Sequence, residues 1–159
     1  MDLGLSNRVV LVSAASKGLG FGIALEAAKE GAVVSLGSRN RKNLETASDQ
    51  IRNEVPGATV LVSELDVSRK DSISSWVRKS LVQFGSIDAL VVNGGVPSPG
   101  KFDELDDEDW LAGYENTLMS AVRMIREVLP EMRRKNGGSI LTITSSSIKE
   151  PIDNLLLSN

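Results

Sequence analysis

A glycine-rich turn near the N-terminus has the residue types that bind a phosphate group. It reads SAASKGLGFG from Ser13 to Gly22 and follows a short apolar run. Glycines at a strand-to-helix turn let a diphosphate approach the first N–H groups of the helix, where the helix dipole favours an anion. The alternative is a tight connection without a ligand. Because the turn opens the first strand–helix unit of the chain, where a dinucleotide site is expected, we interpret it as a phosphate-binding loop.

A cation stands where the ribose of a bound dinucleotide is normally recognised. Arg39 lies 19 residues after Gly20, at the end of the second apolar run, in a segment that reads GSRN. An NAD-binding domain carries a carboxylate there for the ribose hydroxyls. The Arg39 guanidinium instead matches a phosphate with two parallel hydrogen bonds, Ser38 offers a third, and Lys17 adds charge on the same side. Although both cations could be ordinary surface residues, the pattern favours NADP(H).

Five short runs are apolar almost from end to end, at residues 8–13, 32–36, 59–65, 87–93 and 139–144. Such runs are typical of strands that are buried on both faces of a parallel sheet. Residues 19–30, 41–54, 69–84 and 106–135 show the spacing of apolar residues that is typical of helices. Pro130 should kink or shorten the last of these helices. The alternation predicts an α/β fold, a Rossmann-type doubly wound parallel sheet with helices on both faces. We expect residues 1–159 to form a single dinucleotide-binding domain.

Composition excludes several kinds of chemistry. The 159 residues contain no Cys and no His, which removes disulfides, thiolate nucleophiles, zinc–sulfur sites and imidazole bases. The net charge of −3 lacks the excess of basic residues that is typical of nucleic-acid-binding proteins. No apolar run approaches the roughly 20 residues that a membrane span needs. We therefore expect a soluble cytoplasmic protein with no membrane or nucleic-acid partner.

Six carboxylates fall within the seven residues from Asp103 to Asp109. They could be read as metal ligands. A helix N-terminus explains them better, with Asp106 as the N-cap and the next acidic side chains favoured by the helix dipole. We expect no metal site in this chain.

Five motifs in order resemble those of the short-chain dehydrogenase/reductase family. Residues 13–20 resemble its T-G-x-x-x-G-x-G motif, with Ser13 for Thr and Ala14 for the first Gly, a change that should tighten the turn. Residues 65–67 and 93–95 resemble the acidic adenine-contacting position and the N-A-G motif, Asn116 stands at the family's tetrad Asn, and residues 129–145 resemble the stretch that ends in its catalytic Ser. Together with the cation pattern, the resemblance implies the cofactor-binding residues Ser13, Ser16, Lys17, Gly18, Leu19, Gly20, Ser38, Arg39, Asp66, Val67, Asn93, Gly94 and Gly95.

The same resemblance implies an oxidoreductase that moves a hydride between the nicotinamide of NADP(H) and a small-molecule carbonyl or alcohol carbon. Ser145 would polarise the substrate oxygen and Asn116 would hold a water of the proton relay; neighbouring serines leave the choice of Ser145 open by a position. A 3-oxoacyl thioester is one candidate substrate, because the chain is similar to 3-oxoacyl-carrier-protein-reductase-like members.

The family's catalytic Tyr and the Lys four residues after it are missing. The one Tyr is Tyr114, with Leu118 four residues on, and the expected Tyr position falls near Ser158, whose aliphatic hydroxyl is far too weak an acid. Either the chain stops short of a longer protein, with its sheet truncated after the fifth strand, or the Tyr has been replaced in a divergent member. An apolar stripe left on the helix at 106–135 favours a homo-oligomer. The alternative function is a non-catalytic dinucleotide-binding protein or sensor subunit.

Overall fold

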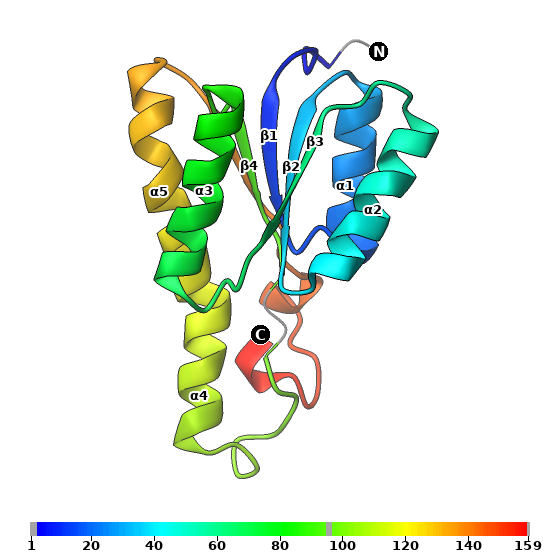
Figure 1. Ribbon diagram of the computed structural model, residues 1–159. Coiled ribbons are helices and arrows are strands. Elements are labelled where there is room, and N and C mark those ends of the chain that lie inside the picture. The colour runs from blue at the N-terminus through cyan, green and yellow to red at the C-terminus, as the bar shows by residue number, and fades with distance from the viewer. Residues whose placement is uncertain (1–2, 95–96, 159) are drawn as a thin grey trace.

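The computed structural model describes residues 3–94 and 97–158 (Figure 1). Its strands are β1 (Val9–Ser13), β2 (Val33–Ser38), β3 (Val60–Glu64), β4 (Ala89–Val92) and β5 (Ser139–Thr142). Its α-helices are α1 (Gly18–Lys29), α2 (Arg41–Glu54), α3 (Lys70–Phe84), α4 (Asp107–Tyr114) and α5 (Ser120–Arg134). A π-helical segment, η1 (Glu115–Met119), joins α4 to α5, and two short 3₁₀ turns, η2 (Ser146–Ile148) and η3 (Leu156–Ser158), follow β5.

The five strands form one parallel sheet in the order β3-β2-β1-β4-β5. Helices α1 and α2 cover one face, and α3 and α5 cover the other (Figure 1). The strand order reverses beside β1, because the chain crosses from β3 over the sheet to pair β4 with the other edge of β1. The expected doubly wound, Rossmann-type architecture is therefore confirmed. In such sheets, ligands bind at the carboxyl ends of the strands on either side of this reversal.

The central strand β1 supplies side chains to both layers of the core. Val10 and Val12 pack with α1 and α2, whereas Val9 and Leu11 pack with the α3 and α5 side. All five residues of β1 are buried, which explains why the run is apolar without alternation.

The last strand departs from the sequence expectation. Residues 139–144 were expected to be buried on both faces, but all four residues of β5 are exposed, and Leu141 keeps 53% of its surface. The physical reason is position: β5 is the edge of the sheet, and on the α1 face an apolar groove of about 760 Å³ borders β4 and β5. No helix of the described chain is both long and apolar enough to cross a membrane.

The long helix expected at residues 106–135 is divided by η1. Asp106 caps its start as expected: Asp106 accepts a hydrogen bond from the Asp109 N–H, and the Asp109 carboxylate reaches back to the Asp106 N–H. The acidic run therefore serves helix initiation, and within the described residues no cluster of acidic side chains is arranged to hold a metal ion. Pro130 lies inside α5 and does not shorten it, since the helix continues to Arg134.

At the amino ends of the strands, Asp88 ties three elements together. Its carboxylate accepts from the Val9 N–H at 2.8 Å, from Lys135 Nζ at 2.6 Å and from Arg8 Nη1 at 3.3 Å. Burial by itself raises the pKa of the Asp88 carboxyl, but the hydrogen bonds from Lys135, Val9 and Arg8 outweigh it and leave the pKa below its usual value. The charged form of Asp88 therefore stabilises the fold.

Replacing this carboxylate should make stability less dependent on pH. We expect Asp88→Asn to lower the free energy of unfolding at neutral pH by about 1–2 kcal/mol, because the two cations lose the negative charge of their acceptor. A lowered pKa means that the contribution is present above the pKa of the unfolded chain, near 3.9 by the usual Asp reference, and is lost as pH falls through the folded value. In urea titrations, the difference between wild type and variant should shrink as the pH falls below about 5.

The matched control is Asp71→Asn, because Asp71 pairs with Arg69 on the surface and its side chain is 70% exposed. We expect little change in stability from that variant. A stability gap for Asp88→Asn that stays constant with pH would contradict the interpretation.

Candidate functional site

The carboxyl ends of β1 and β4 are joined by a reciprocal hydrogen-bond lock between Ser13 and Asn93. The Ser13 hydroxyl donates to the Asn93 carbonyl at 2.7 Å and accepts from the Asn93 N–H at 2.8 Å. The Asn93 amide in turn donates to the carbonyls of Ser13 and Ala14, at 3.3 and 3.4 Å. Both residues were predicted to bind a cofactor. The structure places them beneath the turn, where they fix its backbone.

The glycines of the turn are required by packing as well as by conformation. A Cβ at Gly20 would lie 2.5 Å from the Ala14 carbonyl oxygen and 2.6 Å from the Asn93 amide nitrogen. A larger residue would therefore displace the turn and disturb its hydrogen bonds with Asn93. Gly18 has a φ of +60°, which L side chains rarely adopt. Ala14 itself has a φ of +49°, a left-handed conformation that costs a non-glycine residue about 1–2 kcal/mol. The turn therefore carries backbone strain at Ala14.

Beside this turn lies a cleft of about 290 Å³ at the carboxyl ends of the strands. It is lined by Ala14, Ser16, Lys17, Ser38, Arg39, Leu65, Asp66, Val67, Gly94 and Asn116. Eight of these ten residues were predicted as site residues from the sequence, and the fold brings them together from five separate segments. Ala14, at the turn, and Leu65, beside Asp66, complete the lining.

Two cations enter the cleft without a carboxylate partner. Lys17 and Arg39 are both exposed, and neither forms an ion pair with another described residue. In the same cleft, the Ser16 and Ser38 hydroxyls lie 3.0 Å apart and join the turn after β1 to the last residue of β2. Lys17 precedes α1 with extended backbone, and its side chain does not cap the helix. The first N–H groups of α1 are therefore available to an anion.

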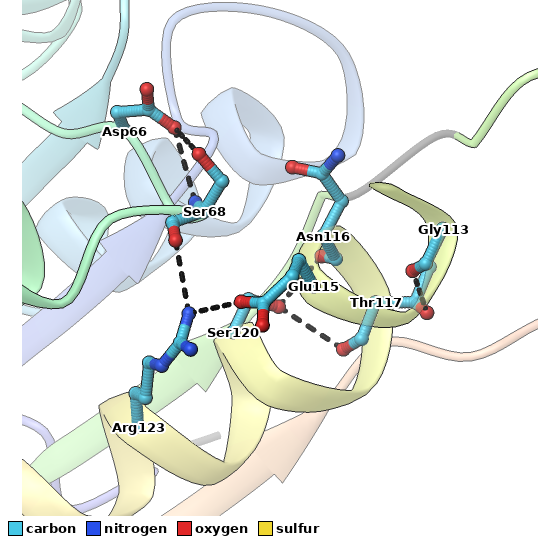
Figure 2. Close-up of polar contacts among 8 residues, drawn as sticks. All are labelled: Asp66, Ser68, Gly113, Glu115, Asn116, Thr117, Ser120 and Arg123. Atoms are coloured by element: carbon cyan, nitrogen blue, oxygen red, sulfur yellow. Dashed lines mark hydrogen bonds and ion pairs between the residues drawn. The ribbon is translucent and has the colours of Figure 1, made fainter. Parts of the chain in front are cut away.

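The loop after β3 is ordered by Asp66. One carboxylate oxygen of Asp66 accepts from the Ser68 N–H at 3.0 Å and from the Ser68 hydroxyl at 2.7 Å, which makes an Asx turn (Figure 2). The Asp66 N–H donates to the Ser72 hydroxyl in α3 at 2.9 Å. This local network holds Asp66 and Val67 at the wall of the cleft.

Asn116 reaches the cleft from the π-helical segment. The Ser120 N–H bonds to the Glu115 carbonyl, five residues back, so the Asn116 carbonyl loses its ordinary helical donor and accepts from the Ser120 hydroxyl at 2.7 Å instead. The Thr117 hydroxyl donates to the Gly113 carbonyl at 2.6 Å (Figure 2). The Asn116 amide group forms no hydrogen bond with another described residue and projects from the helix (Figure 2). Short π segments of this kind are frequent at functional sites.

The remaining predicted residues lie outside the cleft lining. Gly18 and Leu19 border the apolar groove beside β4 and β5, and Leu19 is 70% exposed. Ser145 follows β5 and caps η2, where its hydroxyl accepts from the Ser147 N–H at 3.1 Å. Gly95 lies outside the described residues. The roles of these residues stay predictions.

Sequence reasoning missed the polar residues that shape the helix around Asn116. Thr117 and Ser120 were given no role, although hydroxyls in a helix interior compete for backbone carbonyls and could have indicated an irregular turn. Glu115 and Arg123 were missed as well. The partner of Arg123 across the fold, the Ser68 carbonyl, is 55 residues away in the chain, and no local pattern indicates it.

Comparisons with known proteins agree with this geometry. The chain is 31% identical over 156 residues to an uncharacterized oxidoreductase, YvrD, of Bacillus subtilis (strain 168), covering 98% of this chain and 58% of that protein. It is 30% identical to the 3-oxoacyl-(acyl-carrier-protein) reductase of Chlamydia muridarum, over 89% of this chain and 56% of that protein. The L-sorbose reductase of Gluconobacter frateurii, solved with NADPH and L-sorbose, superposes with a TM-score of 0.95 at 32% identity, covering 99% of this chain and 60% of that one.

The chain thus spans about three fifths of the length of these relatives. A family model described as short chain dehydrogenase matches residues 8–156, which include the glycine-rich turn, the Asp66 loop, Asn116 and Ser145. With the parallel sheet, the cleft at its reversal point and relatives above 30% identity along most of its length, the chain belongs to the short-chain dehydrogenase family.

Proposed function

We propose that this chain binds NADP(H) in the cleft at the carboxyl ends of β1, β2 and β3. The protein that carries it would transfer a hydride between nicotinamide and a carbonyl or alcohol carbon. The observation that carries the proposal is the pair of cations, Lys17 and Arg39, which line one cleft and have no ion-pair partner among the described residues. A reductase that resembles this chain, the L-sorbose reductase, was solved with NADPH, which supports the same cofactor here.

The donors of the cleft fit a dinucleotide phosphate. The free N–H groups at the start of α1 would hold the diphosphate, because the helix dipole and unpaired donors both favour an anion there. Arg39, Ser38 and Lys17 would bind the additional phosphate on the adenosine ribose, since the guanidinium and the hydroxyl supply several donors at one point. Asp66 would contact the adenine from the opposite loop.

The cofactor, when bound, supplies or accepts the hydride. The Ser145 hydroxyl, at the start of η2 after β5, would donate a hydrogen bond to the substrate oxygen, and Asn116 would hold a water of the proton relay with the amide group that projects from the π segment. A 3-oxoacyl thioester is a candidate substrate, because the chain resembles a reductase of that class.

A second candidate is a dinucleotide-binding protein that does not catalyse. Reduction of a carbonyl needs a proton as well as a hydride, and the sequence contains no Tyr-x-x-x-Lys pair to supply it. Tyr114 stands half exposed on α4 and does not line the cleft. Ser158, near the family's Tyr position, accepts a hydrogen bond from the Ser147 hydroxyl through its backbone carbonyl at 3.4 Å. Such a protein would bind the cofactor but would not convert a substrate.

The exposed apolar face of the long helix supports a homo-oligomer. Leu111, Tyr114 and Leu118 fall at helical spacing along α4 and η1 and keep 65%, 50% and 54% of their surface. A second copy that covers this face would remove it from water.

Charge reversal at Arg39 should change which cofactor binds. We expect Arg39→Asp to weaken NADPH binding by roughly tenfold to a hundredfold, the scale of a lost charge-assisted hydrogen bond, while NADH binding is kept or improves. The measurement is the dissociation constant of each cofactor by fluorescence titration.

Lys42→Asp is the matched control, because Lys42 is exposed on α2, three residues away, and does not line the cleft. We expect both dissociation constants to stay within a factor of about two in this variant, since an exposed charge at a distance is largely screened. An Arg39→Asp variant that retains the wild-type preference for NADPH would show that another group recognises the phosphate.

Turnover should depend on Ser145 and not on its neighbour. If the protein reduces any member of a carbonyl panel, Ser145→Ala should lower kcat by about a hundredfold, as loss of one oxyanion donor does, with the NADPH dissociation constant unchanged. Ser146→Ala, next to it and exposed, should leave kcat near wild type. Equal losses in the two variants would contradict the assignment. A wild type that binds NADPH and reduces no substrate would favour the non-catalytic candidate.

A further inference from the structure

Arg123 links the helix that carries Asn116 to the loop that carries Asp66. Its Nη1 donates to the Ser68 carbonyl at 2.9 Å and contacts the Glu115 carboxylate at 2.5 Å. Figure 2 shows the guanidinium between the two acceptors. One nitrogen therefore touches both walls of the cleft region: the loop between β3 and α3, and the start of η1.

On the loop side, this link ends at Asp66, which lines the cleft and is the proposed adenine contact. Ser68 receives Arg123 on its carbonyl, while its N–H and hydroxyl both donate to the Asp66 carboxylate. The three polar groups of one residue thus connect Arg123 to Asp66. A change in the position of Arg123 would be transmitted to the Asx turn and to the cleft lining beside it.

The helix side of the link ends at Asn116. Glu115 is the first residue of the π segment, and its carbonyl accepts the N–H that would otherwise bond to the Asn116 carbonyl. Its side chain is held by Arg123, eight residues later, across about 12 Å of helix. Helical side chains lean toward the N-terminus, which lets the long Arg123 side chain reach back over that distance.

Burial separates this contact from ordinary surface ion pairs. The Arg123 side chain is only 20% exposed, and that of Glu115 is 39% exposed. By comparison, Arg134 on the same helix is 67% exposed and pairs with Glu131 three residues before it, a contact that stays within one turn of α5. Arg123 is therefore the partly buried cation that joins two elements at the cleft.

We propose that Arg123 is a positioning residue that sets the separation between the Asp66 loop and Asn116, so that adenine binding and the placement of Asn116 depend on one guanidinium. This role rests on the proposed NADP(H) function of the cleft. Arg123 does not line the cleft itself and acts through Ser68 and Glu115.

The test compares variants of Arg123 with a matched variant of the same helix. Arg123→Met keeps the aliphatic stem and removes the donors, and Arg123→Lys restores a charged donor. Arg134→Met removes a cation from α5 far from the cleft. We expect Arg123→Met to weaken NADPH binding by roughly threefold to tenfold, at the lower end of the coupling between residues that share contacts, with partial rescue in Arg123→Lys and no change in Arg134→Met.

Amide hydrogen exchange without cofactor gives a second readout. In Arg123→Met, exchange should accelerate both in residues 66–68 and in residues 115–119, because the link between them is lost, and it should not do so in Arg134→Met. Coupling is measured by adding Asp66→Ala. The two substitutions should affect NADPH affinity less than additively, since each one breaks the same chain of contacts.

The outcomes separate the positioning role from the function on which it rests. A wild type that binds neither NADPH nor NADH would remove the proposed function, and the positioning role with it. A wild type that binds NADPH while Arg123→Met binds equally well would overturn the positioning role alone. Additive effects of Asp66→Ala and Arg123→Met would overturn it too. If Arg123→Met melts at a lower temperature with unchanged affinity, Arg123 is a stabilising ion pair only.

Discussion

The lock between Ser13 and Asn93 is the interaction on which the cleft depends. It joins the carboxyl ends of two parallel strands that are neighbours in the sheet but 80 residues apart in the chain. It lies where the strand order reverses, which is the place where α/β sheets leave room for a ligand. Because the Asn93 amide also holds the Ala14 carbonyl, the strained turn before α1 has one position relative to the sheet.

From that fixed turn, the electrostatics of the cleft follow. The amino end of α1, Lys17 and Arg39 all present positive potential to one space, and within the described residues neither cation is neutralised by a carboxylate. Like charges that line one cleft favour a bound anion. The local hydroxyls, Ser16 and Ser38, add donors that hold the two segments together. A bound phosphate would neutralise both cations, which supports the proposed NADP(H) site.

The helix beyond the cleft is shaped by competition for backbone carbonyls. Thr117 and Ser120 place hydroxyls on the carbonyls of Gly113 and Asn116, and the helix widens to a π turn at the residue that faces the cleft. An ordinary α-helix would give Asn116 a different direction from the axis, because each residue turns by about 100°. Arg123 then connects this irregular turn to the Asp66 loop, so that two walls formed far apart in the sequence are held by one side chain.

The sequence alone determined the features that neighbouring residues control. The apolar runs, the glycine turn, the Asp106 cap and the positions of Lys17 and Arg39 follow from side-chain chemistry within a few residues, and they sufficed for the fold and for one side of the cleft. Asp66, Val67, Gly94 and Asn116 were expected only because the chain resembles a known family. Tertiary structure decided the rest. Ser13 meets Asn93, and Arg123 meets Ser68, only because the sheet brings distant segments together. The sequence also predicted that β5 is buried, whereas its residues are exposed. An apolar run looks the same at the centre and at the edge of a sheet, and burial depends on which elements pack against the strand.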